Sequence, residues 1–118
     1  IVTSPPYAAN AIDYMRAHKF SLVWLGHPLS ELANLRRQYI GGETLTDFQL
    51  LPMPEYAARV IAKIAGYDVK KSRVLHRYYS EMTRALAEMY RVLKPGKVAI
   101  VVVGTSTMRG QNTETHTC

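Results

Sequence analysis

The sequence predicts an α/β fold in which two parallel strands are joined by a crossover of several helices. Residues 1–3 are apolar or β-branched and run into two consecutive prolines, as the end of a strand would. Residues 97–103 form a near-continuous apolar run, which is typical of a strand buried on both faces of a parallel sheet. Helical patterns fill much of the chain between them, and such a crossover is right-handed.

The first half of the predicted crossover contains the less regular helices. Residues 8–18 have a helix-tolerant composition, residues 20–25 are apolar, and residues 29–39 resume a polar-apolar helix. We expect Trp24 to lie in the core. Glycines and prolines then indicate a loop as far as residue 54.

Two later helices have clear periodicity. Residues 55–65 suit an amphipathic helix, which Gly66 ends. Asp68 is the expected N-cap of the longest helix, and Lys94-Pro95-Gly96 forms the turn before the second strand. The apolar stripe of the longest helix recurs every three or four residues, at Val74, Tyr78, Met82, Leu86, Met89 and Leu93.

Composition narrows the class of protein. The 118 residues have the length of one domain, and 47% hydrophobic with 20% charged residues is typical of a globular chain. No apolar run approaches the roughly 20 residues that span a bilayer, so we expect no membrane association.

The single cysteine, Cys118, suits a reducing cytoplasm. The four histidines lack ligand spacing, so we expect no metal site.

The formal charge of +6 favours a polyanionic partner such as nucleic acid. Two groups of basic residues are candidates for phosphate contacts, although such groups more often form an ordinary solvated face. The first group is Arg36 and Arg37, and the second is Lys70, Lys71, Arg73 and Arg77.

The most distinctive stretch is Val2-Thr3-Ser4-Pro5-Pro6-Tyr7. Proline fixes its own φ, lacks an N–H and restricts the residue before it to an extended conformation. The stretch is therefore stiff, rich in acceptors and poor in donors, with an aromatic ring beside it. A ligand that donates hydrogen bonds and stacks would fit there.

This stretch resembles the catalytic motif of amino-methylating DNA methyltransferases, in the Ser-Pro-Pro-Tyr form of the branch that methylates cytosine N4. A second segment, Glu88–Gly96 followed by an apolar strand, is similar to the helix, turn and strand found late in many Rossmann-like methyltransferases. The resemblance spans residues 1–104. It implies a partial Rossmann-like class I methyltransferase fold. Residues 105–118 are polar, and from their composition we expect a poorly ordered C-terminal segment.

The resemblance also implies roles for individual residues. The Ser4 side chain and the Pro5 carbonyl would accept the two hydrogens of an exocyclic amine, with Pro6 making the loop rigid. Tyr7 would stack on a base flipped out of DNA. The methyl donor would be S-adenosylmethionine, and Thr3 would lie near it.

The chain lacks the Gly-x-Gly turn that receives this cofactor in such families. We therefore expect residues 1–104 to be the catalytic half of a methyltransferase, inactive without the remainder, whose exposed apolar surface promotes self-association. Two alternatives remain open. The substrate could be adenine N6 or an RNA base, or the chain could be a non-catalytic basic nucleic-acid-binding domain in which the prolines form a turn.

Overall fold

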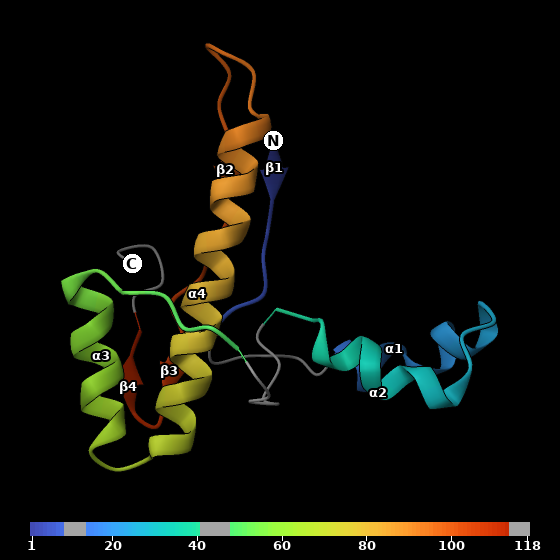
Figure 1. The fold of residues 1–118 in the computed structure, drawn as a ribbon, viewed down its shortest axis with the longest axis horizontal. Coiled ribbons are helices and arrows are strands. Elements are labelled where there is room, and N and C mark those ends of the chain that lie inside the picture. The colour runs from blue at the N-terminus through green and yellow to red at the C-terminus, as the bar shows by residue number, and fades with distance from the viewer. Residues whose placement is uncertain (9–13, 41–47, 114–118) are drawn as a thin grey trace.

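The computed structural model describes residues 1–8, 14–40 and 48–113. Its elements form a small parallel sheet, a set of helices that joins its two strands, and a separate hairpin (Figure 1). In chain order they are β1 (Val2–Thr3), α1 (Tyr14–Trp24), α2 (Leu29–Arg37), α3 (Glu55–Ala65), α4 (Val69–Val92), β2 (Ile100–Val101), β3 (Thr107–Met108) and β4 (Gln111–Asn112).

The predicted parallel pairing of the first strand with the second is confirmed. β1 and β2 lie side by side with Val2 opposite Ile100. The amide of Val102 donates to the carbonyl of Thr3 at 2.9 Å, which extends the ladder by one residue. The order of elements, with helices between two parallel strands, makes the chain α/β.

The helices α3 and α4 pack against each other and form the body of the molecule. The bounds of α3 agree with the prediction. Asp68 caps α4, since its Oδ1 accepts from the amide of Lys71 at 2.9 Å. α4 has 24 residues, yet neither it nor another helix in the described ranges has the length and apolar character to cross a membrane.

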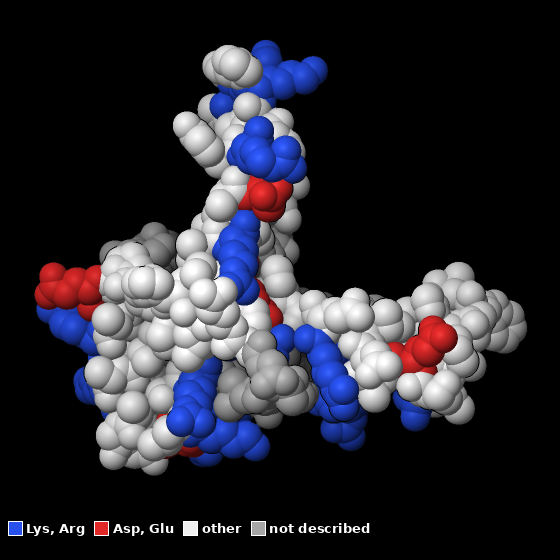
Figure 2. Space-filling view, in the orientation of Figure 1, with Lys and Arg blue, Asp and Glu red and all other residues white. Residues whose placement is uncertain are grey.

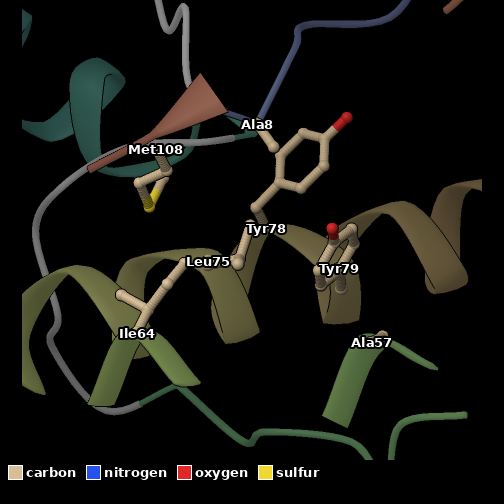
Figure 3. Close-up of a cluster of buried hydrophobic side chains, with 7 residues drawn as sticks. All are labelled: Ala8, Ala57, Ile64, Leu75, Tyr78, Tyr79 and Met108. Atoms are coloured by element: carbon tan, nitrogen blue, oxygen red, sulfur yellow. The ribbon is translucent and has the colours of Figure 1, made fainter. Parts of the chain in front are cut away.

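The core lies where the first half of α4 meets α3, the segment after β1 and the hairpin. The predicted stripe of α4 is buried at Val74 and Tyr78, but Leu86 is 42% exposed. The difference arises because α4 extends beyond α3, so its second half has fewer partners (Figure 1). The central cluster, drawn in Figure 3, comprises Ala8, Ala57, Ile64, Leu75, Tyr78, Tyr79 and Met108.

The second strand is not buried on both faces, which corrects the prediction made for residues 97–103. Val98, Ile100 and Val102 are 71%, 53% and 53% exposed. The alternate residues Val101 and Val103 line a cavity against α4. Among the described residues β2 has one strand neighbour and one covered face, so its apolar side chains alternate between a packed face and an open one.

The prediction that Trp24 lies in the core is also wrong, because its side chain is 91% exposed. Residues 14–24 form one helix, which packs against α2. This pair of helices extends away from α3 and α4 (Figure 1), so the apolar outer face of α1 meets no other described element. We refer to α1 and α2 together as the arm.

The polar segment after residue 104 contains a hairpin that the sequence did not predict. β3 and β4 are antiparallel, with Met108 opposite Gln111. Arg109 and Gly110 both have positive φ, 51° and 77°, as a two-residue type I′ turn requires. Met108 joins the core and Thr113 is fully buried, so residues 105–113 are part of the fold. Residues 114–118 lie outside the described residues.

Candidate active site

The Ser-Pro-Pro-Tyr segment, residues 4–7, which we call the motif loop, leaves the carboxyl end of β1. Its upstream neighbour Thr3 is in the sheet ladder, and its downstream neighbour Ala8 is buried in the core. Both ends of the motif loop are therefore held by packed structure. Sites in α/β folds commonly lie at the carboxyl ends of parallel strands.

The solvent exposure of the motif loop is highest at its first residue and lower at the three that follow. Ser4 is exposed, whereas Pro5, Pro6 and Tyr7 are half-buried. The hydroxyl of Tyr78, in α4, donates to the carbonyl of Pro6 at 2.7 Å. No described residue donates a hydrogen bond to the Ser4 hydroxyl or the Pro5 carbonyl, so among the described residues both remain available as acceptors.

The Tyr7 ring lies against Gly104, which follows the apolar run of the second strand. A Cβ placed on Gly104 would lie 3.4 Å from Cε2 of Tyr7 and 3.5 Å from Cζ. The ring is therefore held by the backbone at the carboxyl end of β2. Loops that follow both parallel strands meet at this point.

A hollow of about 410 Å³ adjoins the motif loop. Among the described residues it is lined by Pro6 together with Gln38, Tyr39 and Ile40, which directly follow α2. It is a shallow depression that is largely open to solvent. This contact was not predicted from the sequence, because residues 38–40 are about 30 positions from the loop.

Arg77 joins the arm to the body and is not the solvated basic residue that the sequence suggested. It is buried, and its Nε lies 2.7 Å from Oε1 of Glu81. Its Nη2 donates to the carbonyl of Arg37 at 3.0 Å, and its guanidinium carbon lies 5.1 Å from the centre of the Phe48 ring. These contacts fix the end of α2 beside α4, and thereby position residues 38–40 next to Pro6.

The remaining basic candidates are exposed, except for Lys71, which is half-buried. Arg36 and Arg37 end α2, immediately before the residues that line the hollow. Lys70, Lys71 and Arg73 are in the first turns of α4, and at 1.5 Å per residue Lys70 is about 12 Å along the axis from Tyr78. Figure 2 shows separate groups of Lys and Arg side chains on the body and at the start of the arm.

Thr3, the expected cofactor contact, is half-buried at the end of β1. Its register partner Val101 lines an apolar cavity of about 310 Å³ between α3, α4 and β2, and paired residues of a sheet share a face. The Thr3 side chain therefore shares the face that α4 covers. The described residues contain no glycine-rich strand-to-helix turn that would hold a dinucleotide-like cofactor beside it.

Two contacts of the motif loop were not predicted from the sequence. The sequence predicted no contact for Gly104, and it predicted Tyr78 only as a member of the apolar stripe of the longest helix. A signal existed for Tyr78, because a buried tyrosine hydroxyl nearly always has a hydrogen-bond partner. The identity of that partner, the Pro6 carbonyl, depends on contact between residues 72 positions apart.

Comparisons with protein-family models, with curated proteins and with solved structures found no match. The functional argument therefore rests on the motif, the geometry of the motif loop and the residues around it.

Proposed function

We propose that this chain is the catalytic half of an S-adenosylmethionine-dependent DNA methyltransferase that methylates an exocyclic amine. The substrate that we propose is N4 of cytosine. The observation that carries the proposal is the pair of acceptors on the motif loop. The Ser4 hydroxyl and the Pro5 carbonyl are presented on a stiff segment at the carboxyl end of a parallel strand, while the neighbouring Pro6 carbonyl is occupied by Tyr78.

The chemistry explains why acceptors are needed there. The lone pair of an exocyclic amine is delocalised into the base, so the nitrogen is a weak nucleophile. Two acceptors that hold its hydrogens favour a pyramidal nitrogen, whose lone pair is then free to attack. Because Pro5 and Pro6 restrict the loop, the acceptors need little rearrangement during the reaction.

The surroundings of the loop suit a flipped base in DNA. Tyr7 offers an aromatic surface, and stacking of a base on such a ring contributes on the order of 1–3 kcal/mol. The hollow beside Pro6 has Tyr39 and Gln38 in its wall, which add a further ring and an amide that can form hydrogen bonds. Arg36 and Arg37, directly before these residues, are suitably located to contact the phosphates of the same strand.

The cofactor would supply a methyl group on a positively charged sulfur. The chain has no Gly-x-Gly turn, and Thr3 is its one candidate contact, so the main cofactor site belongs to the remainder of the methyltransferase. The exposed face of the sheet, at Val2, Val98 and Ile100, is where that remainder would pack and complete a Rossmann-like sheet.

The experiment uses the full-length protein that contains this segment, methyl-labelled cofactor and duplex DNA. Digestion of the product to nucleosides should give label in N4-methylcytosine. Label in N6-methyladenine, or transfer only to RNA, would replace the proposed substrate with one of the alternatives. Binding of DNA without any transfer would identify the non-catalytic binding domain instead.

Variants of the motif loop make the test specific to the proposed site. Ser4→Ala should abolish most turnover while changing the free energy of unfolding by no more than about 0.5 kcal/mol, because Ser4 is exposed. Ser21→Ala, at an exposed position of α1, is the matched control and should remain active. Tyr7→Phe should keep activity and Tyr7→Ala should lose it. Full turnover by Ser4→Ala would refute the proposal.

A further inference from the structure

The hydrogen bond between Tyr78 and Pro6 connects α4 to the motif loop. The Tyr78 side chain is almost fully buried, and Figure 3 shows it directed from α4 towards Ala8, the residue that follows the loop. Its hydroxyl reaches the Pro6 carbonyl at 2.7 Å, which is a short and favourable distance for an O–H donor.

The prolines fix two φ angles of the motif loop, and packing holds its ends, but neither sets the direction of the carbonyls within the loop. Two of its four residues lack an N–H, so they cannot donate to a neighbouring backbone. A carbonyl without a partner could rotate towards solvent and turn the adjacent peptide planes with it. The Tyr78 hydroxyl prevents this for Pro6, and the Pro5–Pro6 peptide that carries the Pro5 carbonyl is adjacent to the fixed group.

We propose that Tyr78 is a positioning residue, which sets the orientation of the Pro5 carbonyl and of Ser4 by holding the Pro6 carbonyl from within the core. This inference rests on the proposed function, because it assigns the orientation a catalytic purpose. It predicts that loss of one buried hydroxyl lowers turnover without weakening the binding of DNA.

The chain offers a matched control in the next residue. Tyr79 is also buried, also in α4, and its hydroxyl also donates to a backbone carbonyl, that of Thr113 at 3.2 Å. Thr113 follows the hairpin and is not part of the motif loop. Tyr78→Phe and Tyr79→Phe therefore each remove one hydroxyl of a buried tyrosine in α4, which bonds to the motif loop in the first case and to Thr113 in the second.

The experiment measures steady-state methylation by the full-length protein and by the two variants. For Tyr78→Phe we expect kcat to fall roughly tenfold to a hundredfold, because small displacements of reacting groups have effects of this size. Its KM for DNA should stay within about twofold of the parent value, and Tyr79→Phe should keep the parent kcat. Equal loss of kcat in both variants, or none in Tyr78→Phe, would overturn the inference.

A second measurement separates this inference from the proposed function. Hydrogen–deuterium exchange at the amides of Tyr7 and Ala8 should become faster in Tyr78→Phe and stay unchanged in Tyr79→Phe. If the parent protein transfers no methyl group, the proposed function fails, and the exchange result still decides whether Tyr78 holds the loop. Unchanged exchange in Tyr78→Phe would overturn the positioning role even in an active enzyme.

Discussion

The ring of Tyr7 packs against the backbone of Gly104, which brings the loop after β1 into contact with the residue that follows the second strand. A methyl group at Gly104 would lie 3.4 Å from Cε2 of Tyr7, which is at the short end of ordinary contact. Larger side chains at position 104 would occupy the space of the ring. The size of this residue therefore limits where the Tyr7 ring can lie.

A graded series at Gly104 tests this contact. Gly104→Ala should keep the fold and most of the activity, because its φ is not in the left-handed region and its Cβ just fits. Gly104→Val adds two further carbons and should displace Tyr7, which lowers methyl transfer and reduces the binding of an unpaired base. Methylation kinetics and thermal unfolding would check both variants. Equal activity of Gly104→Ala and Gly104→Val would show that the size of residue 104 does not limit the position of the Tyr7 ring.

Arg77 and Glu81 should contribute strongly to stability, because their side chains are only 5% and 11% exposed at 2.7 Å separation. Arg77→Met leaves the Glu81 carboxylate buried without its main counter-charge. Losing one partner of a buried ion pair costs about 3–5 kcal/mol. Denaturant unfolding would measure the loss.

The surface pair Arg91 and Glu88 provides the matched control. Its atoms are also 2.7 Å apart, but its side chains are 68% and 66% exposed. Exposed pairs contribute about 0–1 kcal/mol, so Arg91→Met should have little effect. Similar losses in the two variants would show that burial does not set the strength of these pairs.

Asp68 should give the fold a pH dependence in the acid range. The hydrogen bond from the Lys71 amide, and then the hydrogen bond and charge of Arg109, lower the pKa of Asp68 in the folded protein, with a partly opposing effect of desolvation. A lowered folded pKa stabilises the fold above the unfolded value of about 3.9, and this stabilisation is lost as the pH falls through the folded pKa.

Asp68→Asn isolates this effect, because asparagine can still cap α4 but carries no charge. The parent should be the more stable protein at pH 7, and the difference in melting temperature should shrink as the pH falls below about 4. Thermal unfolding from pH 7 to pH 2.5 would measure it. A constant difference across this range would show that the Asp68 charge does not matter.

The two basic groups should differ in how they affect DNA binding. Arg36 and Arg37 adjoin the hollow beside the motif loop, whereas Lys70 and Lys71 are in the first turn of α4 and do not line it. Each lost phosphate contact lowers the slope of log affinity against log salt by about 0.9. Arg36→Ala with Arg37→Ala should therefore reduce the slope by nearly 2, and Lys70→Ala with Lys71→Ala by less. Unchanged slopes would identify both groups as an ordinary solvated surface.

The isolated 118-residue chain should self-associate through its exposed apolar residues. Val98 and Ile100 on the open sheet face, and Phe20 and Trp24 on the arm, are the main candidates. Sedimentation velocity should show species larger than a monomer. Val98→Lys with Ile100→Lys and, separately, Phe20→Ser with Trp24→Ser would show which surface is responsible. A stable monomer of the parent chain would contradict this prediction.

The parts of the fold that the sequence predicts well are those with strong local signals. The periodicity of residues 55–65 and the capping aspartate at 68 define α3 and the start of α4, because both depend on residues a few positions apart. The parallel pairing of β1 with β2 followed from the order of elements. Accessibility of Ser4 is compatible with the expected role of the motif loop, although that role stays a prediction.

The parts that sequence analysis missed depend on contacts between distant residues. Trp24 is apolar, and its exposure reflects the absence of a described element over the arm. Arg77 has the same charge as Arg73, but one is buried against Glu81 and Phe48 while the other faces solvent. The hairpin was hidden because its turn is Arg-Gly, whereas Asn-Gly or Asp-Gly would have indicated it.

The pairing of β1 with β2 has a consequence for the order of folding. Its partners are 98 positions apart, so the chain entropy lost on closing this contact must be offset by structure that has already formed. Local helices such as α3 and α4 need no such closure. We therefore expect α3 and α4 to form early and the motif loop to reach its final geometry among the last events. Pulsed hydrogen exchange during refolding would measure this order.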